Sequence, residues 1–311
     1  MPREGDAARF TSMTTSSTPE RLLEHVAAGG RLTPSEISEL AAAPDILSLG
    51  MLADVVRRRI HDTRITYLRV ATCACDRADI GVIPSGAREV RIVGTPVSLD
   101  AATVTIEKVR ARSGDRAVSG FSWSDVDRVA AAVGLSVSRA LAMLRDAGLE
   151  ALVDVPLDAI ADLDQVVNCL MDAGFSQLRF TIEKAPASAR HTLIERASIL
   201  QEQYGSIQVI NPLPTVLRST RPTTGYDDVK AIAIARLAAP NIPMIQVDWL
   251  RYGPKLAQVA LAFGADDLDV VSASDDAPEG RRRAPLEEVR RSVEAAGLSP
   301  AERDAHFNVV A

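Results

Sequence analysis

The chain has 311 residues, of which 47% are apolar and 24% are charged, so it can bury the core of one large α/β domain or of two small ones. Its net charge of -6 is spread without long acidic or basic runs, which argues against nucleic acid or an anionic membrane as a partner. No apolar run approaches the roughly 20 residues of a membrane span, and the amino-terminal region lacks a continuous apolar signal segment, so we expect a cytoplasmic protein.

The amino-terminal part of the chain predicts helices. Residues 1–18 are rich in Ser and Thr and poor in apolar residues, and we expect a disordered leader there. Residues 19–62 should form a helical cap of three helices, because Thr18-Pro19 and the box from Thr33 to Glu36 are helix-start signals followed by apolar residues at helical spacing.

Short β-rich segments alternate with helical patterns over residues 63–275. The candidate strands are residues 65–70, 89–93, 117–121, 151–155, 176–181, 207–210, 243–247 and 268–271. The candidate helices are residues 100–112, 124–133, 136–147, 157–172, 188–204, 225–237 and 253–263. This alternation predicts an α/β fold with parallel strands, and eight strands favour a TIM-type (β/α) barrel, complete or partly open, over a doubly wound sheet with its glycine-rich turn. Residues 276–311 should add a helix and a tail that pack on the barrel.

Polar side chains near the carboxyl ends of the predicted strands are the candidate ligand-binding residues, because barrel enzymes place their chemistry there. They are Asp248, Trp249, Arg251 and Lys255 after the seventh strand, Gln208 and Asn211 on or after the sixth, and Arg179 with Glu183 near the fifth. Structural roles are the alternative: the first group could cap a helix or join the core, the second could fill the interior, and the third could form an interior ion pair. Three acids, Asp266, Asp267 and Asp269, are expected to be solvated turn residues. No catalytic residue stands out.

The cysteines are few. Cys73, Cys75 and Cys169 cannot make a disulfide framework, which suits a reducing compartment. Cys73 and Cys75 are weak candidates for a metal, because a Cys-x-Cys pair without a nearby His leaves a zinc site half built. Cys169 falls on a predicted helix, where a small buried hydrophobic residue is the simpler interpretation. We therefore expect no metal.

Residues 225–244 (GYDDVKAIAIARLAAPNIPM) and 249–269 (WLRYGPKLAQVALAFGADDLD) are the most distinctive segments. Together with residues 47–61 (LSLGMLADVVRRRIH), and with shorter matches at 134–137, 144–149, 302–304 and 308–310, they resemble the radical S-adenosylmethionine enzymes of the futalosine route to menaquinone, aminofutalosine synthase above all, and their relatives in deazaflavin-cofactor synthesis. The matches are collinear over nearly the whole chain. The resemblance implies a radical-SAM-like barrel.

The resemblance also exposes what this chain has lost. Such enzymes hold a [4Fe–4S] cluster with a CxxxCxxC loop after the first strand, because three thiolates bind three of its irons. At that place this chain has residues 71–80 (ATCACDRADI), with two cysteines and no third thiol nearby. Paired glycines expected after the second strand appear as Gly94-Thr95, and a glycine-rich segment expected after the fourth reads as residues 153–158 (VDVPLD). We therefore expect a degenerate member without an iron–sulfur cluster and without S-adenosylmethionine.

Two functions follow from these observations. The first is a pseudoenzyme that acts as partner or regulator of a radical SAM enzyme in menaquinone synthesis. The alternative is a cofactor-independent barrel enzyme, a lyase, hydrolase or isomerase, acting on a chorismate- or nucleoside-derived small molecule in the barrel mouth. A pocket lined by converging charged side chains would favour the enzyme, and a pocket plugged by apolar residues would favour the partner. A homo-oligomer is compatible with either function.

Overall fold

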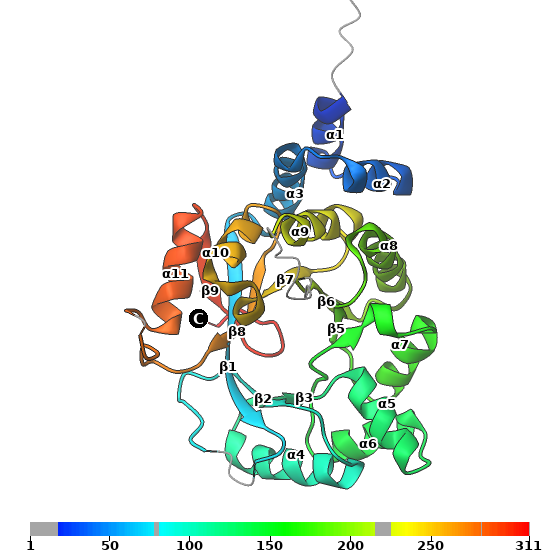
Figure 1. Ribbon diagram of the computed structural model, residues 1–311, viewed down its shortest axis with the longest axis vertical. Helices are drawn as coiled ribbons and strands as arrows, with labels where there is room; N and C mark the ends of the chain where they lie inside the picture. Colours follow the sequence, from blue (N-terminus) through cyan, green and yellow to red (C-terminus); the bar gives the residue numbers. More distant parts are fainter. Residues whose placement is uncertain (1–17, 78–80, 215–224, 281, 311) are drawn as a thin grey trace, which may run out of the picture.

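The computed structural model describes residues 18–77, 81–214, 225–280 and 282–310, and within them strands and helices alternate around a ring (Figure 1). The strands are β1 (Arg64–Ala74), β2 (Glu89–Val93), β3 (Ala117–Gly120), β4 (Val155–Pro156), β5 (Leu178–Ile182), β6 (Ile207–Pro212), β7 (Met244–Asp248), β8 (Asp267–Ser272) and β9 (Ser299–Glu302). The helices are α1 (Thr18–Ala27), α2 (Pro34–Ala42), α3 (Ile46–His61), α4 (Leu99–Ser113), α5 (Trp123–Ala132), α6 (Val137–Asp146), α7 (Leu163–Asp172), α8 (Ala187–Tyr204), α9 (Tyr226–Ala238), α10 (Trp249–Leu261) and α11 (Pro285–Ala295), with a 3-10 turn, η1 (Leu157–Ala159). Each predicted strand and helix has a counterpart.

The first eight strands form a closed circle. They pair in parallel in the order β3-β2-β1-β8-β7-β6-β5-β4. The segment just before β4 closes the circle by pairing with β3: the Gly120 amide donates to the Ala151 carbonyl (3.1 Å), and the Glu150 amide donates to the Val118 carbonyl (2.8 Å). The predicted TIM-type barrel is therefore confirmed.

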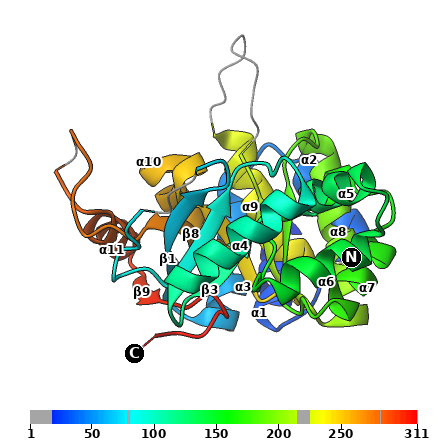
Figure 2. The same cartoon turned by 90° about the horizontal axis from the view of Figure 1, so that it is seen from below.

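Charged side chains fill part of the barrel interior. Arg179 of β5 forms an ion pair with Glu89 of β2 at 2.7 Å, although these two strands are not neighbours in the sheet. Side chains of distant strands can meet in this way only inside the barrel. The outward side chains are apolar and pack against the surrounding helices, as α4 does across β2 and β3 (Figure 2). The predicted apolar runs are therefore strands with both faces buried.

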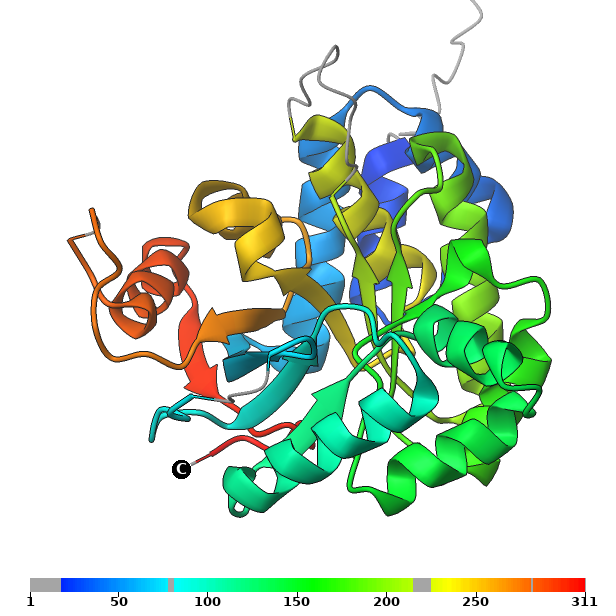
Figure 3. The same ribbon diagram turned by 60° about the horizontal axis from the view of Figure 1, so that its bottom comes forward.

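The three predicted amino-terminal helices, α1 to α3, lie on the outer wall of the barrel. Helix α3 lies alongside α9, α2 contacts α8 and α9, and α1 packs on α3 (Figures 1 and 3). Lys230 of α9 donates to the Ala43 carbonyl at 2.7 Å, and the Tyr226 hydroxyl donates to the Pro44 carbonyl at 2.6 Å. Thr33 and Glu36 form the predicted capping box at the start of α2. The amino-terminal helices are therefore attached to the outer helices of the barrel.

Several details differ from the sequence-based expectation. The predicted helix over 157–172 begins only at Leu163, because residues 157–159 form the turn η1. Helix α10 begins at Trp249 rather than at Gly253. The ninth strand was not predicted; it pairs with the start of β1, Arg64 opposite Ser299. The expected leader falls almost entirely outside the described residues. Among the described helices, none has the length and apolar character that crossing a bilayer requires.

Candidate functional site

A cavity of about 590 Å³, here called the mouth cavity, opens at the carboxyl ends of the barrel strands. All eight barrel strands, or the residues directly after them, contribute to its lining, through Thr72, Arg91, Phe121, Pro156, Thr181, Asn211, Asp248 and Asp269. Parallel strands in a closed barrel bring their carboxyl ends to one face, where barrel enzymes hold their substrates. The volume suits a metabolite of nucleoside size.

Among the described residues, Asp154 is the acid of the mouth cavity whose side chain has no partner. Within the described part of the chain its carboxylate makes no hydrogen bond or ion pair, while its backbone carbonyl accepts the Trp123 amide at 3.0 Å. Burial, together with the nearby Glu183 carboxylate, raises the pKa of Asp154 to about 6. A carboxyl group that titrates near neutrality can exchange a proton with a bound molecule. Asp154 is therefore the strongest candidate for acid–base chemistry.

The turn after β7 places an acidic side chain, Asp248, and a cationic one, Arg251, beside the cavity. Asp248 accepts the backbone amides of Leu250 and Arg251, both at 2.9 Å, and so caps α10. Burial raises the pKa of Asp248. The Arg251 guanidinium lies 3.5 Å from the Glu183 carboxylate and 3.8 Å from that of Asp248. Gly253, with φ of +70°, breaks the helix after this turn. The predicted turn therefore both caps a helix and lines the cavity.

Arg91 is a buried cation whose charge is compensated within the protein. Its guanidinium donates to both oxygens of Asp269, at 2.9 and 3.0 Å, and its Nε donates to Glu89 at 2.7 Å. Although burial opposes ionisation, Arg91 holds the pKa of Asp269 below its ordinary value. Because this charge is already paired and the lining holds more carboxylates than cations, the cavity suits a ligand that carries positive charge or donates hydrogen bonds.

The expectation of solvated acids after α10 is wrong. Asp266, Asp267 and Asp269 are 3%, 0% and 4% exposed. They form ion pairs with Arg236, Arg303 and Arg91. Sequence spacing could not reveal these partners, because each arginine lies tens of residues away along the chain.

The eight candidate residues separate into two groups. Asp248, Arg251, Asn211 and Glu183 line the mouth cavity. The others do not: Lys255 is exposed on α10, Gln208 is half-buried on β6, Trp249 is buried in the core, and Arg179 lies deeper in the barrel. Arg179 and Glu183 do not pair with each other, since Arg179 bonds Glu89 and Glu183 contacts Arg251.

Arg91, Asp125, Asp154 and Asp158 line the same cavity and were missed from the sequence. Asp154 and Asp158 lie in residues 153–158, which we interpreted only as a lost glycine-rich segment. Asp158 has a structural role there, because its carboxylate accepts the backbone amides of Glu183 and Ala185 at 3.0 and 2.7 Å. Two acids at the end of a predicted barrel strand were the signal that could have identified Asp154.

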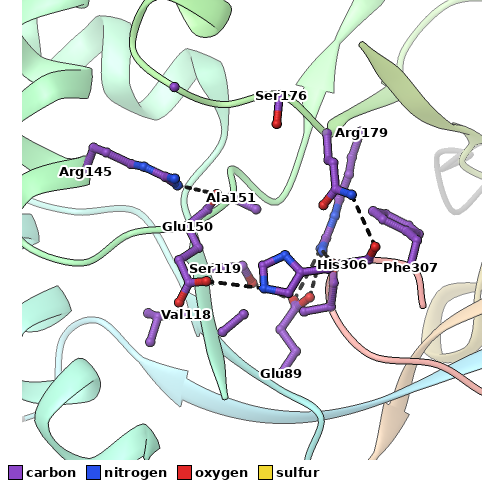
Figure 4. Close-up of a pocket in the computed structure, with 14 residues that line it drawn as sticks. Glu89, Val118, Ser119, Arg145, Glu150, Ala151, Ser176, Arg179, His306 and Phe307 are labelled. Carbon is purple, nitrogen blue, oxygen red and sulfur yellow. Dashed lines mark hydrogen bonds and ion pairs between the residues drawn. The ribbon is translucent and has the colours of Figure 1, made fainter. Parts of the chain in front are cut away.

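A second, smaller cavity of about 80 Å³ lies near the amino ends of the strands (Figure 4). Its charged side chains are already paired: Arg179 bonds Glu89, and His306 lies 3.4 Å from Glu150. Figure 4 shows Phe307 beside Arg179, and their cation–π distance is 5.4 Å. A cavity this small is below the size of metabolite sites, and this end of a barrel serves stability. The mouth cavity is therefore the candidate site.

Comparison with known proteins supports a family assignment. Residues 210–311 match the model of the CofH/MqnC C-terminal region. The chain is 27% identical to 5-amino-6-(D-ribitylamino)uracil–L-tyrosine 4-hydroxyphenyl transferase 2 of Methanosarcina barkeri, over 89% of this chain and 85% of that enzyme. It is 24% identical to cyclic dehypoxanthine futalosine synthase of Streptomyces coelicolor, over 94% and 88% of the two chains. It is 36% identical to aminodeoxyfutalosine synthase of Thermus thermophilus, over 32% and 28%.

The fold agrees with this relationship. The structure superposes on that of methylornithine synthase with a TM-score of 0.62 at 16% identity, covering 92% of this chain and 98% of the other. At this identity the likeness concerns the fold alone. Taken with the sequence matches, the barrel places the protein among radical S-adenosylmethionine-type α/β barrels. Within them, the sequence matches support the relationship to the futalosine-type enzymes that the resemblance indicated.

These relatives correct the expectation about cofactors. We expected neither an iron–sulfur cluster nor S-adenosylmethionine, but the homologues are radical SAM enzymes that bind both. S-Adenosylmethionine is a nucleoside with a sulfonium and an ammonium charge, so it fits the size and acidic lining of the mouth cavity. Gly94, Thr95 and Asp154 would hold it there. In such enzymes it supplies radical chemistry together with the cluster.

The thiols fit a cluster less well. Cys73 is buried near the end of β1 and Cys75 is half-buried just after it, and burial raises the pKa of both. Cys169 lies elsewhere, between α6 and α7, with its Sγ 3.2 Å from the Ser138 hydroxyl. Within the described residues the chain thus contributes two thiols where the family uses three. No step proposed below involves a cluster.

Proposed function

We propose that the mouth cavity is a working small-molecule site and that the protein acts in the cytoplasm on a nucleoside- or chorismate-derived metabolite of the futalosine route to menaquinone. The observation that supports this is Asp154, whose carboxylate lies in a cavity of about 590 Å³, has no partner among the described residues, and has its pKa raised to about 6. Converging charged side chains line this cavity, and that is the property which favours an enzyme over a plugged barrel.

Asp154 would exchange a proton with the bound metabolite, and Arg251 with Asp248 would orient it from the turn after β7. Ionised Asp154 also suits a cation or a hydroxyl donor, such as a ribose hydroxyl. Deprotonation of Asp154 therefore strengthens binding of such a ligand as the pH rises through about 6.

The experiment is a binding screen of nucleosides and menaquinone-pathway intermediates against the wild-type chain and Asp154→Asn. We expect at least one ligand whose affinity rises several-fold from pH 5 to pH 7 in the wild type, with no such rise in the variant. Lys255→Ala is the matched control, because Lys255 is exposed and does not line the cavity. A complete lack of binding, or a pH dependence that survives in Asp154→Asn, would refute the proposal.

A second candidate function is a partner role beside a radical SAM enzyme of the same route. It is favoured by exposed apolar side chains next to the cavity lining: Val97 is 86% exposed and Leu250 is 67% exposed. Such a partner would dock over the mouth. Co-purification with, or a rate effect on, an aminofutalosine synthase would support it, and substitution of both residues by Ser should then abolish the effect.

A further inference from the structure

The floor of the mouth cavity is formed by two amide side chains, Asn211 of β6 and Gln246 of β7. Both line the cavity and both are almost fully buried, at 5% and 3% exposure. The Asn211 Nδ2 donates to Gln246 Oε1 at 3.5 Å. Asn211 Oδ1 is buried and has no hydrogen-bond partner among the described residues. A buried carbonyl oxygen left unpaired is costly, so this atom calls for an explanation.

The orientation of both amides is fixed from below by Asp267. Gln246 Nε2 donates to Asp267 Oδ2 at 2.6 Å, and Arg303 donates to both carboxylate oxygens of Asp267 at 2.6 and 2.8 Å. The Thr66 hydroxyl donates to Oδ1 at 2.6 Å. An ionised carboxylate only accepts hydrogen bonds, so Gln246 must turn its NH₂ group toward Asp267. Its oxygen is then directed to Asn211.

The same argument fixes the orientation of the Asn211 side-chain amide. Because Gln246 presents an oxygen, Asn211 must present its NH₂ group in return, and its own oxygen is left without a donor. Asn211 thus donates to Gln246, Gln246 donates to Asp267, and Asp267 also accepts from Arg303 on its other side. A reversed Asn211 amide would place its oxygen against that of Gln246, which is unfavourable.

We infer that Asn211 Oδ1 accepts a hydrogen bond from an N–H group of the ligand, so that the deepest part of the ligand is an amino-substituted heterocycle. This inference rests on the proposed small-molecule site and names a chemical class for its ligand. Asn211 is the residue that determines specificity, and Gln246 is a positioning residue that acts through it. A ligand that presents a carbonyl at the same place meets an oxygen and is rejected.

Adenosine and inosine test this inference, because they differ by an amino group and a carbonyl at the same ring position. Calorimetry with the full chain should show adenosine bound about tenfold more tightly than inosine, the effect expected when a buried polar group is left unpaired. In Asn211→Ala the ratio of the affinities for adenosine and inosine should fall to about one.

Two further variants separate positioning from folding. Gln246→Leu removes the oxygen that orients Asn211, so the amide can turn over and the ratio should fall several-fold while adenosine still binds. Gln208→Ala is the matched control on β6, the strand of Asn211; it lies outside the cavity lining and should leave the affinity ratio unchanged. A merely structural role would weaken both nucleosides equally and leave their ratio constant.

The outcomes distinguish this inference from the proposed function. If the wild type binds neither nucleoside, the mouth is not a nucleoside site and the inference is overturned with it. If adenosine and inosine bind equally, or if Asn211→Ala keeps the wild-type ratio, the inference alone is overturned. In that case the proposed small-molecule site is kept, and only the role of Asn211 in selecting the ligand is lost.

Discussion

The two ends of the barrel interior hold charged side chains in different states. Toward the amino ends of the strands, Glu89 is fully buried and bonded by Arg91, Arg179 and Ser119. At the carboxyl ends, Asp154 lies in a cavity of about 590 Å³ without a partner in the described chain. Arg91 of β2 connects the two ends through Glu89 and Asp269. Paired charges at one end stabilise the barrel, while the unpaired charge at the other leaves capacity for a ligand.

The largest expected effect on stability is at the amino ends of the strands. Glu89→Ala leaves Arg179 and Arg91 without this buried partner, and should lower the free energy of unfolding by about 3–5 kcal/mol. The matched control is Glu150→Ala, whose ion pair with Arg110 is partly exposed and should contribute about 1 kcal/mol or less. Denaturant unfolding of both variants measures the difference. Equal losses would show that the buried network has no special role.

Asp154→Asn should raise the free energy of unfolding, in contrast to Glu89→Ala. Since the pKa of Asp154 is raised to about 6 in the folded protein from 3.8, the folded state holds the extra proton between these values, and ionisation above them destabilises the fold. The variant should therefore be more stable than the wild type above pH 6, by up to about 3 kcal/mol, and equal to it below about pH 4. Thermal unfolding across this pH range measures the gain. A variant less stable than the wild type at pH 7 would contradict a free, desolvated carboxylate.

Gly94→Ala should have a smaller effect. Gly94 has φ of +97°, and a Cβ atom placed on it would lie 3.1 Å from the Cys75 sulfur. The substitution should destabilise the protein by about 1 kcal/mol and weaken ligand binding, because Gly94 lines the mouth cavity. Gly134→Ala is a control with a similar φ of +69° but open space around it. Comparable losses of affinity in both variants would remove the case for close packing at Gly94.

The smallest expected effect concerns the turn after β7. Arg251→Ala removes the cation beside Glu183 and Asp248 and should change ligand affinity by about two- to fivefold, as expected for an exposed charge pair. Lys255→Ala, one helical turn further and outside the lining, should change it by less than twofold. Binding titrations at low and high salt measure both, and the Arg251 effect should shrink with salt.

Sequence patterns predicted the barrel because its elements are periodic. Alternating apolar strands and amphipathic helices indicated all eight barrel strands, and Thr33 with Glu36 marked a helix start correctly. The ninth strand was missed because residues 299–302 (SPAE) contain a proline and no apolar alternation. Such a strand is stabilised by its pairing with β1, which no local pattern reveals.

The site was predicted only in part, because side-chain direction and partners depend on the closed barrel. Asp248 and Arg251 were found since they follow a strongly apolar strand. Trp249, their neighbour, turned into the core instead. Asp154 was overlooked because residues 153–158 were interpreted only as a lost glycine-rich segment. Its importance comes from neighbours on other strands, such as Glu183, that sequence alone could not bring beside it.

The pairing of Asp267 with Arg303 has a consequence for how the chain is made. The two residues are 36 positions apart, and both are fully buried. During synthesis β8 emerges first, and its carboxylate cannot be enclosed favourably until Arg303 follows. Final closure of the barrel around this charge must therefore wait for the segment after β9. A ribosome stalled between these positions should hold a chain that is loosely closed and more open to proteolysis than the released protein.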